Sequence, residues 1–343
     1  MKYILNKLDD NIRTTNNFKI NDISIDLDLP TTYDFHDFNI SNEEIIIKKE
    51  IVSNTLSSRI GLSFNKYLNV DIIIPKYKKF NDVLIEYNFN NNDCLISNFN
   101  IIFEEGSSCD LIFKFKSNDQ NKHFNFFKEN IISKENSTGS ISFINLLNNN
   151  SSSFLSIEDN INNSSNITHN LIDLGGSIRI NNIISNIYDR ANYYINNLYL
   201  GFNEDIIDMN YYLKNIGKNS NSNLVVEGSL NDSSKKNFRG IIDLCEGATK
   251  ACGFENENCI LLSDTCRSRS LPVLLCHEED VSGSHGVSTG KIDNDKLFYL
   301  MSRGYSLNEA LKLIVLSRFY PIINNISIES IRNEILDYLD SLF

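Results

Sequence analysis

The chain has 343 residues, enough for a large core, and it carries a formal net charge of −12. This acidity argues against a nucleic-acid partner, whose phosphates need a basic face, and against binding to an anionic membrane surface. No apolar run approaches the roughly 18 residues that a bilayer-spanning helix needs, so we expect no membrane partner.

The chain begins without the apolar stretch of a secretory signal. Its seven cysteines then point to a reducing compartment and to free thiols, so we expect a cytoplasmic protein. Residues 21–29 alternate polar and apolar side chains, as a strand does, whereas residues 44–52 fit either a strand or a helix. We expect residues 1–65 to form a small N-terminal lobe.

Residues 66–290 form a long succession of short β-type segments separated by turns rich in asparagine, serine and glycine. Branched and aromatic side chains, which favour a pleated surface, gather at residues 70–74, 83–87, 101–103, 111–115, 140–144, 177–180 and 224–226. Periodicity does not distinguish a sandwich, a barrel and a solenoid. The lack of helices between the strands argues against a doubly wound fold, and so long a run of strands favours a stacked architecture.

From residue 291 the pattern becomes helical, and we expect a C-terminal helical domain over residues 291–343. Leu297, Leu300 and Met301 share one helix face, and Gly304 suits a helix C-terminus. Ser306 and Glu309 have the spacing of a capping box, which marks the start of the next helix.

The next two helices each carry one apolar face, which either packs within the chain or binds a partner. In the first of them the apolar residues are Leu307, Ala310, Leu311, Ile314 and Val315. Pro321 is expected to end or kink that helix. In the second they are Ile328, Ile331, Ile335, Leu339 and Leu342.

Five cysteines lie close together in the sequence, at Cys245, Cys252, Cys259, Cys266 and Cys276, with His277 and His285 nearby. Thiolates and imidazoles are ligands that iron and zinc prefer, so this segment indicates metal or sulfur chemistry. None of the five belongs to a CxxC pair, and buried cysteines often act as inert packing residues. Cys94 and Cys109 lie far upstream and are expected to pack in the core. His36, His123, His169 and His277 have no supporting pattern.

Several motifs occur in an order and spacing that resemble the core of the SufB/SufD family, the scaffold components of the SUF iron–sulfur cluster assembly machinery. They are Phe238-Arg239-Gly240, Leu262-Ser263-Asp264, Glu279-Asp280-Val281, Ser284-His285-Gly286, Leu297-Phe298-Tyr299 and Ser302-Arg303-Gly304, with residues 100–106 and 173–176 upstream. The resemblance covers roughly residues 70–320. It implies a mainly β fold with a right-handed parallel β-helix core, in which each turn buries the apolar face of its neighbour. Inward asparagines would pair with their equivalents in the next turn.

The resemblance also implies a site. His285 matches a histidine at the SufB–SufD interface, and it would be an iron ligand, although a surface histidine in a turn is the alternative. The position of the sulfur-accepting SufB cysteine falls on Glu257, and Cys259 lies two residues on, a shift that preserves the strand face. The SufD-type cysteine position is Gly283 here.

The candidate residues for an iron–sulfur cluster are therefore His285, Glu257, Cys259, Cys266 and Cys276. Cys266 and Cys276 are included because SufB-type chains tend to carry cysteine at these two positions. For an iron ion, the candidate ligands are His285, Glu257, Glu279 and Cys276. Both iron and the cluster would be held transiently.

Residues 286–292 look like a phosphate loop, but three residues separate the glycines instead of four, and Ile292 replaces the hydroxyl residue. We therefore expect a non-catalytic chain that binds no nucleotide. The resemblance implies a separate SufC-type ABC ATPase docked on the C-terminal helices, and a cysteine desulfurase as the source of sulfur. It also implies a homodimer or a SufB/SufD-type heterodimer.

Two functions remain open at this point. The chain is a scaffold that builds and transfers clusters, or a SufD-like structural subunit without a cluster of its own. A polysaccharide-acting β-helix enzyme fits poorly, because such secreted enzymes need a signal peptide and a carboxylate cleft.

Overall fold

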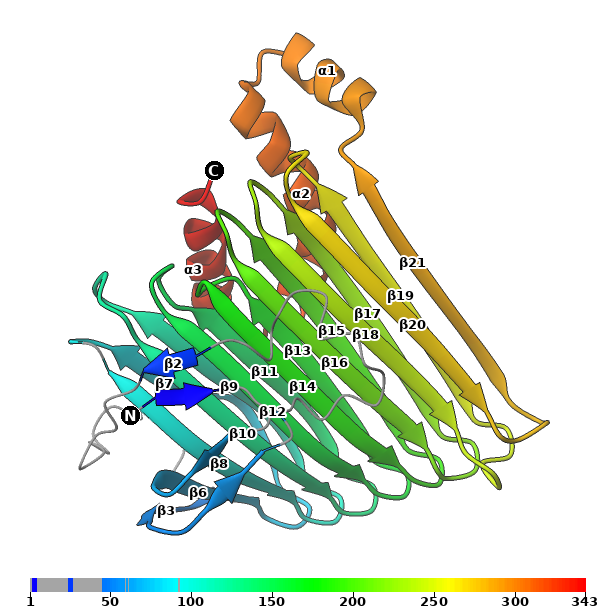
Figure 1. Ribbon diagram of the computed structural model, residues 1–343. Helices are drawn as coiled ribbons and strands as arrows, with labels where there is room; N and C mark the ends of the chain where they lie inside the picture. The colour runs from blue at the N-terminus through cyan, green and yellow to red at the C-terminus, as the bar shows by residue number, and fades with distance from the viewer. Residues whose placement is uncertain (1, 5–23, 27–44, 59, 61, 92) are drawn as a thin grey trace.

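The computed structural model describes residues 2–4, 24–26, 45–58, 60, 62–91 and 93–343. Its core is a coil of about eight turns, in which the chain alternates between two sheets (Figure 1). The prediction of a mainly β protein with a β-helix core and C-terminal helices is confirmed. Most of the predicted N-terminal lobe, residues 1–65, lies outside the described residues, as does His36.

Nine strands form the first sheet: β3 (Ile46–Val52), β6 (Tyr67–Ile74), β8 (Cys94–Phe103), β10 (Phe124–Ser133), β12 (Ser152–Ile161), β14 (Ile178–Ile187), β16 (Ile206–Asn215), β18 (Lys235–Leu244) and β20 (Arg267–Cys276). Eight strands form the second sheet: β7 (Lys79–Phe89), β9 (Ser108–Ser117), β11 (Thr138–Leu146), β13 (Asn166–Asp173), β15 (Asn192–Gly201), β17 (Asn221–Leu230), β19 (Cys252–Leu261) and β21 (Ser282–Lys291). Two small antiparallel pairs join β1 (Lys2–Ile4) to β2 (Ser24–Asp26) and β4 (Leu56–Ser57) to β5 (Ser63–Phe64).

The predicted strand segments between residues 70 and 226 all fall within these strands, except that Ser177 precedes β14. Residues 44–52, which fit a strand or a helix, contain β3, and this strand runs antiparallel to β6 at the start of the nine-stranded sheet. The other neighbours in the two large sheets are parallel, as a coil requires.

Equivalent residues of successive turns pair in register. The spacing varies from 26 residues, as between Ser152 and Ile178, to 32 residues, as between Lys235 and Arg267. The difference in length lies in the loops, while the strands keep their alternation of inward and outward side chains. A fixed count along the sequence therefore does not give the partner of a residue.

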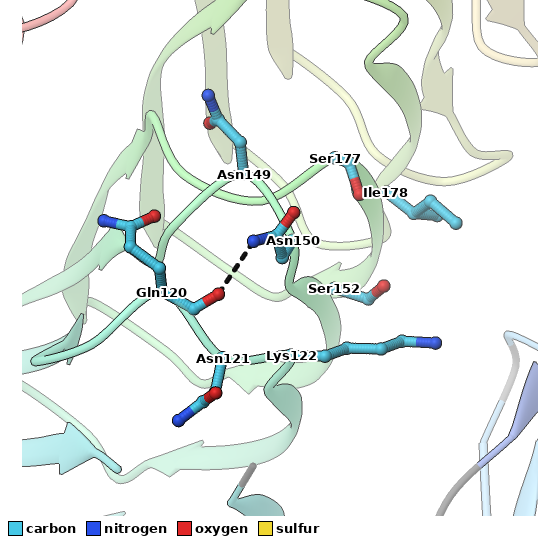
Figure 2. Close-up of a pocket in the computed structure, with 8 residues that line it drawn as sticks. All are labelled: Gln120, Asn121, Lys122, Asn149, Asn150, Ser152, Ser177 and Ile178. Atoms are coloured by element: carbon cyan, nitrogen blue, oxygen red, sulfur yellow. Dashed lines mark hydrogen bonds between the residues drawn. The ribbon is translucent and has the colours of Figure 1, made fainter. Parts of the chain in front are cut away.

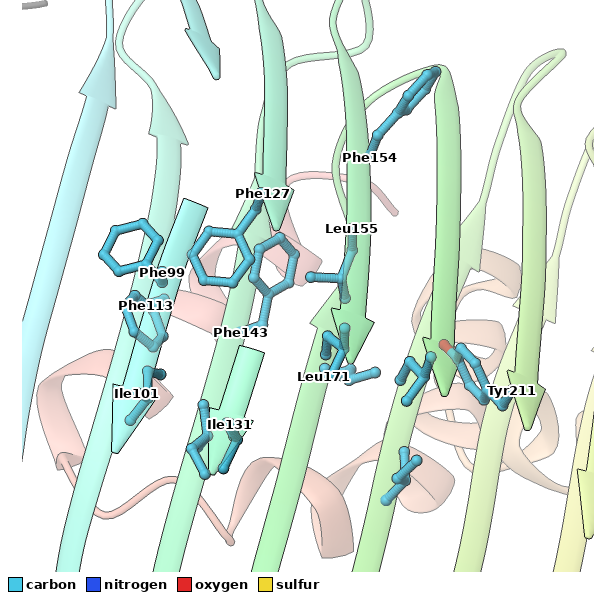
Figure 3. Packing of buried hydrophobic residues seen from close by; sticks show 14 of the residues in the cluster. Phe99, Ile101, Phe113, Phe127, Ile131, Phe143, Phe154, Leu155, Leu171 and Tyr211 are labelled. Atoms are coloured by element: carbon cyan, nitrogen blue, oxygen red, sulfur yellow. The ribbon is translucent and has the colours of Figure 1, made fainter. Parts of the chain in front are cut away.

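Aromatic and branched side chains fill the space between the two sheets (Figure 3). Phe127 stacks on Phe99 with ring centroids 4.9 Å apart, and it meets Phe113 and Phe143 at 5.0 and 5.3 Å. Each turn alone would leave these rings exposed, so burial between adjacent turns is what stabilises the coil.

Asparagine ladders run on the outer face of the coil, and one inward asparagine, Asn145, donates to Asp173 Oδ1 at the equivalent position of the next turn at 2.8 Å, so the predicted inward pairing occurs with an aspartate as the partner. Asn98 donates to Asn69 Oδ1 at 2.8 Å, and Asn130 donates to Asn98 Oδ1 at 3.0 Å. Asn98 alternates along β8 with the core residues Phe99 and Ile101, which face inward. Amides stack where water can satisfy their remaining groups, whereas the interior favours apolar contacts.

Three helices follow the coil: α1 (Asn294–Ser302), α2 (Leu307–Ile323) and α3 (Glu329–Asp340). Gly304 has a φ of 102° just after α1, and the capping box of Ser306 and Glu309 is formed, as the sequence predicts. The helices α2 and α3 cover the outer face of the eight-stranded sheet, where Ile144 and Leu198 pack with their buried residues (Figure 1).

The buried face of α2 differs in part from the prediction. Its buried residues are Ala310, Val315, Leu316, Phe319, Ile322 and Ile323. Leu307, which was expected on that face, is 49% exposed, because the sheet contacts the side of the helix that carries Leu316 and Phe319. Pro321 does not end the helix, which continues to Ile323.

Candidate functional site

The predicted site residues lie on the last strands of the coil, β19, β20 and β21, and on their connections (Figure 1). Alternate residues of a strand face the same side, so Glu255, Glu257 and Cys259 of β19 share the buried, inner face. His285 of β21 is in register with Glu255 and therefore faces the same way. The structure thus places His285, Glu257 and Cys259 on one face at one end of the coil.

Glu257 forms a buried ion pair. Lys236 of β18 donates to its Oε1, and both side chains are 0% exposed. Tyr199 donates to the same oxygen at 3.2 Å, and Lys236 also donates to Ser270 Oγ at 2.7 Å. The other oxygen, Oε2, has no hydrogen-bond partner among the described residues. One carboxylate oxygen of Glu257 is therefore left for a ligand.

Cys259 lies two residues beyond Glu257, and its side chain is buried. Burial raises the pKa of its thiol, while the ammonium group of Lys236 and the nearby hydroxyl of Tyr199 act in the opposite direction. The sequence-based expectation that Cys259 shares the strand face of Glu257 is confirmed by the burial pattern of β19.

Glu255 is an interior residue of this site that the sequence did not single out. Neither of its carboxylate oxygens has a hydrogen-bond partner among the described residues. Burial, and then the nearby Glu257, raises its pKa to about 8. The register with His285 is the signal that identifies it, and register appears only once the strands are paired.

The motif Phe238-Arg239-Gly240 has a different structural reason at each position. Phe238 is buried in the main core. Arg239 donates to both carboxylate oxygens of Asp208 on the neighbouring strand, at 3.0 and 2.6 Å. A Cβ atom at Gly240 would lie 2.3 Å from Glu255 Oε1, so the glycine leaves the space that this carboxyl group occupies.

The other predicted residues are spread around the end of the coil. His285, Cys276 and Glu279 are exposed, whereas Cys266 is buried with its sulfur 3.0 Å from the carbonyl oxygen of Ser263. Within the described residues, the predicted ligands do not form a group of three whose ligating atoms lie within 4.8 Å of one another. The prediction of an iron site here stays a prediction.

The last turn of the coil presents unpaired strand edges. Of the described strands, β20 pairs only with β18, and β21 pairs only with β19. An exposed strand edge carries N–H and C=O groups that can pair with another chain. The exposed residues His285 and Val287 lie on β21, directly beside that edge.

The remaining cysteines divide into two kinds. Cys94 and Cys109 are buried in the main core, as predicted, and burial raises the pKa of Cys109 to about 12. Cys245 and Cys252 are half-buried near the connection between β18 and β19.

A second polar group lies in the middle of the coil, far along the sequence from the predicted site. We call Glu129, Asp159, His169 and Tyr193 the mid-coil group; all four side chains are buried. His169 Nε2 lies 2.8 Å from Glu129 Oε1, and its Nδ1 lies 3.0 Å from the hydroxyl of Tyr193. Sequence reasoning missed it, because the only available signal is charged residues at positions where a strand should be apolar.

Two hollows on the surface are lined mostly by polar residues. One of about 550 Å³ lies among the loops that precede β10, β12 and β14, where Asn150 donates to the carbonyl oxygen of Gln120 at 2.7 Å (Figure 2). The other, of about 370 Å³, lies on the eight-stranded sheet beside Asn325. Neither is lined by a predicted site residue.

The first C-terminal helix and the start of the second present apolar residues to solvent. The helix α1 has no buried residue, and Phe298 and Tyr299 are 75% and 56% exposed. Tyr305 and Leu307 extend this surface at 45% and 49% exposure. None of the helices that the structure describes is long and apolar enough to cross a bilayer.

Comparison with known proteins gives one family and several relatives. The family model described as "SUF system FeS cluster assembly, SufBD core domain" matches residues 87–318, more than half of the chain. The iron–sulfur cluster assembly protein SufD of Bacillus subtilis is 32% identical over 124 residues, which are 36% of this chain and 28% of that protein. SufD of Escherichia coli is 24% identical over 48% of this chain and 39% of its own length. The SufBD family protein ycf24 of Galdieria sulphuraria is 31% identical over 29% of this chain. Each alignment covers less than half of the relative's length.

Proposed function

The chain belongs to the SufBD family of the SUF iron–sulfur cluster assembly system, and on this premise we propose that it is a scaffold subunit on which clusters are built and passed on. Iron and the cluster are cargo in this proposal and not resident cofactors. The chain itself would carry out no ATP hydrolysis, which belongs to a separate ABC-type ATPase.

The observation that carries the proposal is the inner face at the end of the coil. There His285 lies in register with Glu255, next to Glu257 and Cys259, and beside unpaired strand edges. Imidazole, carboxylate and thiolate groups are suitable iron ligands. The predicted ligands do not form a compact set of three within the chain, which supports a cluster site completed by residues of a second chain.

The second chain would join the last turn of the coil. The free edges of β20 and β21 favour a homodimer or a heterodimer with a SufB/SufD-type paralogue. Each of these strands ends a parallel sheet, and a strand of a second chain could extend that sheet. Closure of this edge would bury His285 and the exposed Val287, and would exclude water from the ligands.

The ATPase would dock on the apolar surface of the C-terminal helices. Phe298, Tyr299, Tyr305 and Leu307 support this assignment, because large exposed aromatic and aliphatic residues that gather on one surface mark protein interaction sites. Movement of these helices by the ATPase would reach the site directly, since α1 follows β21 after two residues.

Sulfur would arrive from a cysteine desulfurase. Of the candidate thiols, Cys276 is exposed and Cys259 is buried, so Cys276 is the thiol that a donor protein can reach. A thiolate at Cys276 would attack the terminal sulfur of the donor persulfide, which transfers that sulfur and releases the donor thiolate.

The decisive experiment is anaerobic co-expression of the chain with its ABC ATPase, followed by size-exclusion chromatography and assays of iron and acid-labile sulfide. We expect a complex that carries both, and an at least fivefold loss of both in the variant His285→Ala. The matched control is His277→Ala, since His277 is also an exposed histidine near the end of the coil.

Each other outcome has a definite meaning. A stable complex without iron and sulfide would make the chain a structural subunit that supports a cluster-bearing paralogue. Equal metal content in His285→Ala and in the unaltered chain would overturn the site assignment. The absence of any complex would overturn the partner assignment.

A further inference from the structure

The mid-coil group brings ionisable side chains from both sheets into the interior. Glu129 lies on β10 and Asp159 on β12, which are neighbours in the nine-stranded sheet, while His169 lies on β13 of the other sheet. The register places Asp159 opposite Ile131, two residues along from Glu129, so both carboxylates face the same side. Three strands from two successive turns therefore converge on one point inside the coil.

The contacts within the group leave one oxygen without a partner. Glu129 Oε1 lies 2.8 Å from His169 Nε2, and Tyr193 donates to Asp159 Oδ2 at 2.8 Å. The backbone N–H of Ile131 donates to Asp159 Oδ1 at 3.2 Å. Glu129 Oε2 is buried and has no hydrogen-bond partner among the described residues. An unpartnered buried carboxylate oxygen is costly, and it points to a missing ligand.

The charges of the group need either shared protons or a bound cation to neutralise them. Two carboxylates lie side by side in an apolar interior, and no lysine or arginine of the described chain forms an ion pair with either of them. A neutral imidazole and two carboxylates neutralise one divalent ion. Burial of a net charge is strongly unfavourable, so such an ion would stabilise the coil from within.

We propose that Glu129, Asp159 and His169 form a buried site for one divalent transition-metal ion, separate from the cluster site at the end of the coil. One ligating atom from each residue already lies within 4.8 Å of the other two. The imidazole ligand favours ions such as Zn²⁺ and Fe²⁺ over Mg²⁺ and Ca²⁺, which prefer oxygen alone.

The remaining partners orient the ligands for this role. With Nε2 on the ion, His169 Nδ1–H donates to the Tyr193 hydroxyl, which in turn donates to Asp159. A metal-bound histidine commonly has its second nitrogen held in this way. The ion would widen the present 2.8 Å contact between His169 and Glu129 to about 3.3 Å, the separation of two ligands on a tetrahedral ion.

The test uses the full chain, expressed alone and without an ATPase or a sulfur source, so that it does not depend on cluster assembly. Because the site is buried, the ion is taken up as the coil forms. The chain is therefore unfolded, refolded with Co²⁺ or Zn²⁺, and dialysed against EDTA. We expect about one metal ion per chain to remain, and visible Co²⁺ absorption bands typical of a tetrahedral site.

The variant Glu129→Gln keeps the size and shape of the side chain and should retain less than a tenth of the metal. The matched control is His123→Gln, since His123 is also buried but has a single carboxylate partner, Asp119, at 2.9 Å. It should retain the metal in full. Circular dichroism confirms that both variants have refolded.

Two results would overturn the proposal. In the first, the unaltered chain retains no ion and shows no Co²⁺ bands, a result that depends on no variant. The group would then be a network in which His169 shares protons with two carboxylates. In the second, Glu129→Gln retains as much metal as the unaltered chain. Neither result bears on the iron and sulfide content of the ATPase complex, which depends on His285.

Discussion

Glu255 illustrates how the interior of the coil controls the charge of a single residue. Its carboxyl group lies between the strands without a hydrogen-bond partner among the described residues, and burial raises its pKa to about 8. In the unfolded chain the same group would ionise near its ordinary pKa of 4.5. Between these two values the folded chain holds a proton that the unfolded chain has released.

The free energy of unfolding should therefore fall as the pH rises from about 4.5 to about 8, because the folded state binds the extra proton. The variant Glu255→Gln mimics the protonated group and should be more stable than the unaltered chain at pH 8, by about 4 kcal/mol. The two should converge near pH 4. Urea unfolding across this pH range measures the difference.

The control for this prediction is Glu246→Gln, which removes an exposed carboxylate from the turn after β18. It should keep the pH dependence of the unaltered chain. An unchanged dependence in Glu255→Gln would show that this carboxyl group is already ionised in the folded protein.

The candidate thiols differ in their access to solvent. Cys276 is exposed, whereas Cys259 is 3% exposed and burial raises the pKa of its thiol. Since the accessible thiolate is the nucleophile, we expect Cys276→Ser to lower persulfide loading from a cysteine desulfurase at least tenfold, and Cys259→Ser to leave it within twofold. Anaerobic alkylation followed by mass spectrometry measures the loading at each position. Loss in Cys259→Ser alone would reverse the assignment.

At the scale of elements, the helix α3 is held on the sheet by both apolar and ionic contacts. Ile331, Ile335 and Leu339 are buried against it. Glu334 accepts from Lys114 and Lys116 of β9, each at 2.6 Å. Burial acts to raise the pKa of Glu334, but the bonds from the two lysines outweigh it and lower the pKa. The ion pairs of Glu334 with Lys114 and Lys116 therefore favour the position of α3 on the sheet.

Replacement of this carboxylate should loosen the helix without unfolding the coil. We expect Glu334→Gln to cost about 2 kcal/mol, because it leaves the buried ammonium group of Lys114 with Glu86 as its remaining acidic partner. Hydrogen exchange should increase in α3 and remain unchanged in β15 and β17. The control Asp337→Asn, at an exposed position of the same helix, should change neither the free energy of unfolding nor the hydrogen exchange of α3.

At the scale of the whole molecule, each turn of the coil contacts mainly the turns on either side of it. Stability in such a fold is close to a sum of contributions from individual turns and their interfaces. A defect in one turn should therefore be felt locally, while distant turns keep their structure. The free edges at the last turn follow from the same geometry, since this turn has a neighbour on one side only.

Phe127 offers a test of this local behaviour, because it packs against aromatic rings of both sheets in the middle of the coil (Figure 3). Phe127→Ala should cost about 4 kcal/mol through the cavity that it leaves. Hydrogen exchange should rise in β8, β10 and β12 but not in β18 and β19. The control Tyr194→Ala removes a ring from the outer face, where Tyr194 is 38% exposed, and should cost less than about 1 kcal/mol. A uniform rise along the whole coil would contradict local behaviour.

The sequence by itself determined the succession of strands, the capping box at Ser306, the absence of long helices from the core, and the family motifs around His285. These features depend on local alternation and on side-chain type, which neighbouring residues in the chain reveal. It also identified Cys259 as sharing a strand face with Glu257, since a shift of two residues preserves the face.

Only the tertiary structure decided that Glu257 pairs with Lys236, that Glu255 lies beside His285, and that Glu129, Asp159 and His169 meet. These contacts join residues of opposite sheets or of successive turns, and the number of residues in a turn varies from 26 to 32. Counting along the chain cannot give such partners, because each loop of different length shifts the register of every later turn. These residues come together because the strands pair in register and the two sheets enclose one interior.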